Sequence, residues 1–302
     1  MNQSFVIAGT IVAGIALTIA LTRPIVAQTS SIDWKPVAAA LGREGSVMAG
    51  GVYRVGFPRS DLKISVEGIA IKPTLSLGTY AAFVPMGTGA MVMGDFVVTE
   101  DELQTAMSKL QEAGLSQTAV HKHLIGESPR IWWMHYGGTG DPVKLAQGIR
   151  AALETTRTPV AAPASTVPVE ITGFDPKALE AIIGRSGKNN GGVYNFTIAR
   201  GEKIMMDGME LPPATGVTTV LNFQPIGDGK AAINGDIAMT AKEVDPVLRA
   251  LRSSGIAVVE VHQHMLSDEP HLFYTHFWAV DDAQKLARGL RAAVDQTNTV
   301  KP

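Results

Sequence analysis

The sequence predicts an α+β protein made of two tandem homologous repeats, each a mostly antiparallel sheet with two or three helices. The first observation is internal duplication, because a shift of about 141 residues superimposes most of the first half on the second. Gly50–Tyr53 matches Gly191–Tyr194, and Lys144–Ala146 matches Lys285–Ala287. The second observation is that each half contains strand-like alternation as well as helical periodicity. The chain is therefore one domain present twice.

The elements of the second half can be predicted in order, and the first half follows the same plan. A short helix at Pro176–Ile183, matched by Trp34–Leu41, precedes a glycine-rich turn. Strands are then expected at Gly192–Ile198, Lys203–Met209, Val217–Pro225 and Lys230–Met239, the last two joined as a hairpin by Gly227–Gly229.

Helix signals follow the predicted strands. Thr240 is expected to cap a helix over Ala241–Ser253, with Glu243 at the capping-box position and Gly255 just after the end. Next come a strand with the pattern H-x-H, a turn, and a returning aromatic strand. A closing helix is expected at Asp281–Gln296, or Pro142–Thr155 in the first half. This order of elements predicts an antiparallel sheet with helices in each repeat.

The domain boundaries follow from composition. Residues 1–30 are expected to be a signal peptide or an N-terminal anchor, because Phe5–Leu21 is almost wholly apolar and ends at Arg23 and Pro24. Repeat 1 is expected at 31–156, a linker rich in proline and alanine at 157–173, and repeat 2 at 174–302. Either reading of the leader predicts a periplasmic or secreted protein, with a membrane tether if the leader is not cleaved.

Composition excludes several function classes. A formal net charge of −2 without a basic run argues against a nucleic-acid partner. The absence of cysteine removes thiolate metal ligands, a cysteine nucleophile and a lipid anchor on cysteine. No Walker loop, serine-hydrolase elbow or HExxH motif is present in the sequence. The expected partner is a small-molecule or cell-envelope ligand that the sequence does not name.

The distribution of histidine is the main functional signal. All seven histidines lie in two segments that share the pattern H-x-H-x3-[ED]-x-P-x5-H. The matched histidines are His121, His123 and His135 in the first segment and His262, His264 and His276 in the second. His271 has no counterpart in the first copy and is expected at the surface or at the rim of a site.

The spacing of these histidines predicts a metal site in each repeat. Side chains on a strand alternate between faces, so His121 and His123 share a face, and a hairpin centred near Ser128 would place His135 directly opposite His121. Three imidazoles on one face suit a divalent transition metal with open positions, zinc first and iron or copper as alternatives. Glu127 and Asp268 are candidate catalytic carboxylates, acting as general base or orienting an imidazole.

Other matched residues have simpler explanations. Arg59 and Arg200 are expected in structural ion pairs, with anion binding as the alternative. Asp95 and Asp236 each follow a glycine, and turn capping is the expected role, with metal ligation as the alternative. The aromatic residues near the histidines are expected in the core and in the wall of a pocket.

The chain resembles the LppY/LpqO family of secreted bacterial proteins in both repeats. The resemblance is carried by GGVYNFTIAR at 191–200, the H-[KQ]-H segments, the histidine followed by Phe277 and Trp278, and DDAQKLARGLRAAV at 281–294. It implies export and a duplicated domain, and it names no reaction. The first copy departs from the pattern at Tyr136 and Gly137, so the two sites need not be equivalent.

The sequence therefore predicts an exported protein with a duplicated histidine site for a divalent transition metal. Three readings remain open at this point: a metalloenzyme that activates water or polarises a substrate oxygen, a binding protein of the envelope, and a protein in which the histidines only pack in the core. Convergence of the imidazoles and an adjoining pocket would separate the first two readings from the third.

Overall fold

Two six-stranded antiparallel sheets, one from each repeat, organise the chain in the computed structural model. The structure describes residue 1, residues 32–162 and residues 169–301. The predicted leader falls on residues outside these ranges, and so does part of the predicted linker. No helix in the described ranges is long and apolar enough to span a membrane.

The two repeats have nearly the same order of elements. The first contains α1 (Lys35–Leu41), β1 (Ser46–Val47), η1 (Ala49–Gly51), β2 (Tyr53–Pro58), β3 (Ser65–Val66), β4 (Ile69–Ala70), α2 (Pro73–Ser76), β5 (Gly78–Met86), β6 (Gly89–Thr99), α3 (Leu103–Glu112), β7 (Ser116–His121), β8 (Ile131–Gly140) and α4 (Pro142–Leu153). The second contains α5 (Pro176–Ile183), β9 (Lys188–Asn190), β10 (Val193–Ala199), β11 (Met205–Met206), β12 (Met209–Glu210), η2 (Pro213–Thr215), β13 (Thr218–Gly227), β14 (Lys230–Thr240), η3 (Ala241–Glu243), α6 (Val244–Ser253), β15 (Ala257–His262), β16 (Leu272–Asp282) and α7 (Ala283–Val294).

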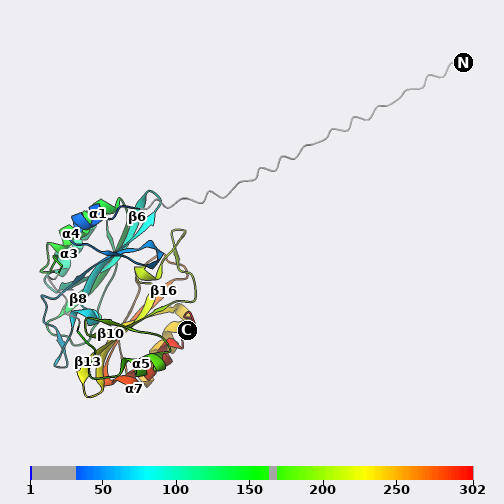
Figure 1. Cartoon of the computed structure of the whole chain (residues 1–302). Helices are drawn as coiled ribbons and strands as arrows, with labels where there is room; N and C mark the ends of the chain where they lie inside the picture. The colour runs from blue at the N-terminus through cyan, green and yellow to red at the C-terminus, as the bar shows by residue number, and fades with distance from the viewer. Residues whose placement is uncertain (2–31, 163–168, 302) are drawn as a thin grey trace.

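The sheets have equivalent strand orders. The first runs β1-β2-β5-β6-β8-β7, and the second runs β9-β10-β13-β14-β16-β15. The predicted hairpin at Gly227–Gly229 is confirmed by the pairing of β13 with β14. The predicted α+β class with two repeats is confirmed as well, because each sheet carries its own helices (Figure 1).

Each sheet buries both of its faces. On the outer face, apolar strand residues such as Phe83 and Phe96 pack with Leu110 of α3 and Ile149 of α4 in one core cluster. The equivalent cluster of the second repeat joins its sheet to α5, α6 and α7. These helices therefore lie on the outside of the molecule and the inner faces of the two sheets are turned toward each other (Figure 1).

Two further core clusters join the repeats across the inner faces. One contains Met91 and Met93 of β6 together with Leu211 and Tyr274 of the second repeat. The other contains Leu75 of α2 with residues of both sheets, including Trp133 and Trp278. Each repeat also places a short helical segment on the sheet of the other. Helix α2 of the first repeat lies against β13 and β14, and η2 of the second repeat lies against β5. The inner faces are thus one continuous interior.

The capping signals read from the sequence correspond to real contacts. Thr240 and Glu243 form a capping box, in which the Glu243 carboxylate accepts a hydrogen bond from the Thr240 N–H at 2.7 Å. The helical segment begins with the short turn η3 before α6, so the predicted helix is divided in two. In the first repeat Glu102 accepts from the Thr99 N–H at 2.9 Å.

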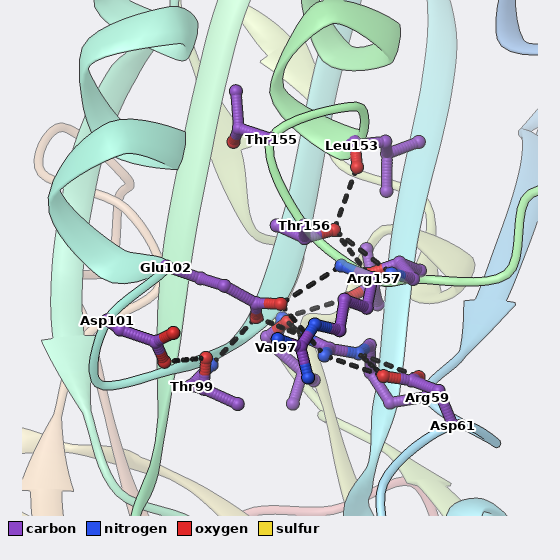
Figure 2. A network of polar contacts seen from close by, with 12 residues as sticks. Arg59, Asp61, Val97, Thr99, Asp101, Glu102, Leu153, Thr155, Thr156 and Arg157 are labelled. Atoms are coloured by element: carbon purple, nitrogen blue, oxygen red, sulfur yellow. Dashed lines mark hydrogen bonds and ion pairs between the residues drawn. The ribbon is translucent and has the colours of Figure 1, made fainter.

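The matched arginines complete these capping networks. Arg59 is fully buried and donates to Glu102 at 2.7 Å, to the Val97 carbonyl at 2.9 Å and to Asp61 (Figure 2). Arg200 repeats the arrangement with Glu243 at 2.8 Å. The expected structural role of both arginines is confirmed, because each guanidinium is neutralised by carboxylates and ties a sheet to the start of a helix.

Candidate metal centre

Six histidines from the two repeats converge between the inner faces of the sheets. The imidazoles of His121 and His262 stack with ring centroids 4.2 Å apart, and they mark the junction of the two repeats. On either side of them, His123 lies 3.8 Å from His276 and His135 lies 4.1 Å from His264, measured between ring centroids. The two matched sets of histidines therefore form one composite cluster, in which a pseudo-twofold axis relates the set of one repeat to that of the other.

Strand geometry explains how the histidines reach this position. His121 and His262 are the last residues of β7 and β15, and His135 and His276 lie within β8 and β16. The remaining two, His123 and His264, follow the ends of β7 and β15 in the loops. Five of the six side chains are buried, His121 wholly, and the His123 side chain is 13% exposed.

The predicted register of the hairpin was wrong by two residues. His121 lies opposite Trp133, and His135 lies opposite Ala119. In the second repeat His262 lies opposite Tyr274 and His276 opposite Glu260. The turn is not centred on Ser128 because the backbone of Ser128 pairs with Ser65 through two 2.9 Å hydrogen bonds. A shift of two residues leaves the four histidines within the strands on the predicted face.

Two aspartates accompany the imidazoles. Asp95 lies opposite His135 in the pairing of β6 with β8, and Asp236 lies opposite His276 in the pairing of β14 with β16. Asp95 Oδ2 is 3.2 Å from His123 Nε2, and Asp236 Oδ2 is 3.0 Å from His264 Nε2. Turn capping was thus the wrong expectation for these aspartates, because both lie well inside long strands.

A sequence signal for these aspartates existed. Asp95 is the one charged residue in β6, a strand that is otherwise apolar or small from Gly89 to Val98. An unpaired charge inside a buried strand is costly, so its presence indicates a partner on the inner face. The matching Gly-Asp pair at 235 and 236 repeats the same signal.

Backbone carbonyls fix the protonation of three imidazoles. Nδ1 of His276 lies 2.7 Å from the Gly235 carbonyl, Nδ1 of His135 lies 3.3 Å from the Gly94 carbonyl, and Nδ1 of His264 lies 2.9 Å from the Gly216 carbonyl. A carbonyl only accepts, so Nδ1 donates in each contact and Nε2 keeps its lone pair. These Nε2 atoms are buried without a hydrogen-bond partner among the described residues.

Burial keeps the imidazoles neutral. Desolvation, followed by the proximity of the other imidazoles, holds the pKa values of His121 and His262 well below the ordinary value. Desolvation also lowers the pKa of His264 and of His276 to about 4. Burial raises the pKa of Asp236 to about 6 although His276 opposes the shift. At neutral pH the six rings therefore present lone pairs, the form that binds a metal ion.

Three groups of these side chains have ligating atoms close enough to hold one ion. In each group the atoms lie within 4.8 Å of one another. The groups are His121 with His123 and His276, His121 with His135 and His262, and Asp236 with His262 and His276. Two of the three groups combine residues of both repeats.

Glu127 and Asp268 lie in the loops next to this cluster and have partners of their own. The Glu127 carboxylate accepts from Lys122 Nζ at 2.6 Å. Asp268 contacts His271 Nδ1 at 2.7 Å and accepts from the Leu272 N–H at 2.8 Å. None of the three groups of candidate ligands in the described chain includes either carboxylate. His271 is about two-fifths exposed and lies at the surface, which was one of its two expected places.

A cavity of about 630 Å³ adjoins the cluster. Its wall includes Asp95, His123, His135, Asp236, His264 and His276. Residues of both repeats line the rest of it, among them Arg54 and Tyr80 of the first and Asn195 and Asn222 of the second. The imidazoles and aspartates can thus contact both a bound ion and a molecule in the cavity.

Comparison with known proteins gives the family of the chain and no function. No curated protein matches the chain. Among solved structures the chain is similar to a trimeric bacterial microcompartment shell protein, PduB, at 12% identity and a TM-score of 0.22, with 85% of this chain and 96% of that chain covered. EtuB from Clostridium kluyveri matches at 8% identity and a TM-score of 0.21, with 83% and 88% covered. The fused permuted hexameric shell protein MSM0275 from the RMM microcompartment matches at 11% identity and a TM-score of 0.19, with 81% and 94% covered.

One family model matches the chain twice. It covers residues 35–155 and again residues 177–296, and these two segments contain the two sheets and the six clustered histidines. The chain therefore belongs to the family described as Domain of Unknown Function (DUF1259), of which it contains two tandem copies.

Proposed function

We propose that the protein binds a divalent transition metal at the composite cluster of histidines and aspartates between its repeats. The observation that carries this proposal is the set of buried side-chain atoms that have no hydrogen-bond partner among the described residues. It includes Nε2 of His135, His264 and His276, both ring nitrogens of His262, and one carboxylate oxygen each of Asp95 and Asp236. Burying so many unpaired polar atoms at one point is expensive unless a ligand satisfies them.

The type of donor favours particular ions. Imidazole nitrogen with a minority of carboxylate oxygen suits zinc, iron and copper, whereas calcium and magnesium prefer oxygen ligands. Zinc is the first expectation, and the neutral imidazoles already have the protonation state that each of these ions requires. The carbonyls of Gly94, Gly216 and Gly235 orient three of the rings, as supporting groups do around metal ligands.

The adjoining cavity favours a metalloenzyme over a metal carrier. A carrier needs a site from which the ion can exchange, while a cavity of about 630 Å³ beside the donors provides room for a substrate. A metal ion there would supply Lewis-acid activation of water or of a substrate oxygen, as in metal-dependent hydrolases. The described aspartates nearest the imidazoles are Asp95 and Asp236, and proton transfer at this centre would fall to them before the partnered Glu127 and Asp268.

The test is the metal content of the purified protein, measured by plasma mass spectrometry. Wild type is compared with the triple variant His262→Ala/His264→Ala/His276→Ala and with His271→Ala, which removes the histidine outside the cluster. We expect near-stoichiometric metal in wild type and in His271→Ala, and its loss from the triple variant. Absence of metal from wild type even after incubation with zinc, iron and copper salts would refute the proposal.

We also propose that the protein is exported and belongs with the LppY/LpqO proteins. The apolar stretch Phe5–Leu21 and the sequence motifs support this assignment. Mass spectrometry of protein fractionated from the producing cell checks it. A periplasmic or secreted product, cleaved near residue 30 or still membrane-tethered, is expected, and accumulation of the full chain in the cytoplasm would contradict export.

A further inference from the structure

The cavity beside the histidine cluster contains a guanidinium without a counterion. Arg54 is the one lysine or arginine among the described residues that line the cavity. No ion pair between described residues involves it. By contrast, the buried Arg59 and Arg200 each pair with two carboxylates. The positive charge of Arg54 is therefore available to a ligand.

The position of this guanidinium is fixed by the fold. Its central carbon lies 3.5 Å from the centroid of the Tyr80 ring, a cation–π contact. One of its nitrogen atoms, Nη1, donates to the Ala214 carbonyl of the other repeat at 3.0 Å. Apart from a hydrogen bond with the Tyr80 hydroxyl, the guanidinium makes no other hydrogen bond to a described residue, and the side chain is half-buried. A planar guanidinium held in this way is suited to bind a carboxylate through two parallel hydrogen bonds.

The inner face of the first sheet connects Arg54 to the histidine cluster. Tyr80 lies opposite Asp95 in the pairing of β5 with β6, and Asp95 lies opposite His135 in the pairing of β6 with β8. Neighbouring strands are about 4.8 Å apart, so the guanidinium above Tyr80 lies roughly 5 to 10 Å from the aspartate and imidazole. A small organic acid spans this distance.

The second repeat provides neutral polar groups in place of the arginine. Asn195 occupies the position of Arg54, and its amide donates to Asn222 at 2.7 Å. The hydroxyl groups of Thr74 and Ser76 also lie in the cavity wall, buried and without a partner among the described residues. One end of the cavity is therefore cationic and the other offers hydroxyl and amide groups, which match the hydroxyls of a ligand.

We propose that the cavity binds a small hydroxylated carboxylate, with its carboxylate on Arg54 and its hydroxyl groups directed toward Thr74, Ser76 and the histidine cluster. The contact of the hydroxyl end with a bound ion rests on the metal centre proposed above. The contact of the carboxylate with Arg54 depends only on the cavity.

Isothermal titration calorimetry with defined probes tests this ligand class. D-Glucuronate and D-gluconate represent hydroxylated carboxylates, D-glucose is the neutral match, acetate is a carboxylate without hydroxyls, and inorganic phosphate is a different oxyanion. The probes are titrated into wild type, Arg54→Gln, and the control Arg249→Gln, which removes an exposed guanidinium on α6. Metal content is measured on the same samples.

We expect glucuronate or gluconate to bind wild type and Arg249→Gln alike, and Arg54→Gln at least about tenfold more weakly, because a charged hydrogen-bonded pair is lost. Glucose and acetate should also bind wild type at least about tenfold more weakly. Equal affinity for Arg54→Gln, no binding of either sugar acid to wild type, or equally tight binding of phosphate would overturn the assignment.

The two proposals can fail separately. Wild type that contains metal but binds neither sugar acid would refute the ligand class and leave the metal centre intact. Wild type that binds a sugar acid through Arg54 but takes up no metal would refute the metal centre and leave the carboxylate contact intact.

Discussion

The six clustered imidazoles are neutral because burial in the fold makes the charged form unfavourable. Desolvation is the largest cause of the lowered pKa at each of these histidines. In the unfolded chain the same side chains would protonate near their ordinary value of about 6.5. Because the pKa of each histidine is lower in the folded protein than in the unfolded chain, the free energy of unfolding depends on pH.

We therefore expect the metal-free protein to lose stability as the pH falls below about 6.5, since below that value the unfolded chain binds protons that the folded protein excludes. The loss continues down to the folded pKa, about 4 for His264 and His276. Each histidine contributes a slope of about 1.4 kcal/mol per pH unit in that window. Urea unfolding of chelator-treated protein at several pH values measures this slope. In the double variant His264→Asn/His276→Asn the free energy of unfolding should depend less steeply on pH. A free energy of unfolding that is constant from pH 7 to pH 4 would contradict this account.

The buried arginines contribute to stability and do not contact the metal centre. Arg59→Met would leave the buried carboxylate of Glu102 without its ion-pair partner. Removal of one partner of a buried ion pair lowers the free energy of unfolding by about 3–5 kcal/mol. Arg249→Met breaks an exposed pair and should cost about 1 kcal/mol or less. Urea unfolding compares the two variants, and metal content should be unchanged in both. Equal destabilisation by the two substitutions would argue against a structural role for Arg59.

At the scale of elements, the glycine before each aspartate sets the packing of the long strands. A Cβ on Gly94 would lie 2.2 Å from the Tyr80 carbonyl oxygen and 2.5 Å from the Tyr136 ring. A Cβ on Gly235 would lie 2.0 Å from the Val220 carbonyl oxygen. Because the obstacles include backbone atoms, neither position can accept a side chain without moving a neighbouring strand.

Gly94→Ala and Gly235→Ala should each lower the free energy of unfolding by about 1–3 kcal/mol, the usual cost of overpacking. Gly56→Ala in β2 is the matched control, since a Cβ there would meet nothing within 4 Å. Thermal unfolding of the three variants makes the comparison. The explanation fails if Gly56→Ala is as destabilising as the two other substitutions.

Local sequence patterns predicted most of the helices and strands but not the register of the strand pair that carries the histidines. The capping box at Thr240 and the hairpin at Gly227–Gly229 depend on neighbours in sequence, and they were predicted correctly. The register at His121 depends on a contact between Ser128 and Ser65, residues far apart in the chain. Alternation within the hairpin carries no information about such a contact.

At the scale of the whole molecule, the duplication creates a site that neither repeat has alone. The sequence indicated two matched histidine motifs, but it held no sign that they would face each other. That arrangement depends on the inner faces of the two sheets, which are apolar around the cluster and bury each other. Hydrogen bonds between the repeats support it, including one from the Lys122 N–H to Glu260 at 2.8 Å and one from Asn234 to the His123 carbonyl at 2.6 Å.

Pseudo-twofold symmetry predicts the number of ions. The group of His121, His123 and His276 has a symmetry-related counterpart in His262, His264 and His135, whose ring centroids lie 4.1–5.4 Å apart. This counterpart is not one of the three groups whose ligating atoms all lie within 4.8 Å of one another, so a second ion there requires a small movement of the side chains. Six imidazoles and two carboxylates exceed the four ligands of a tetrahedral ion. We expect two ions per chain at saturation, measured by zinc titration with plasma mass spectrometry after removal of free metal. Saturation at one ion per chain would show that the two halves share a single ion.

A crystal structure of the metal-loaded protein, with anomalous diffraction data collected at the absorption edge of the bound metal, tests directly whether the two repeats share the metal centre. We expect anomalous density between Asp95 and Asp236, about 2.1 Å from imidazole nitrogen atoms of both repeats. Density elsewhere, or an ion held by histidines of one repeat only, would contradict a composite metal centre.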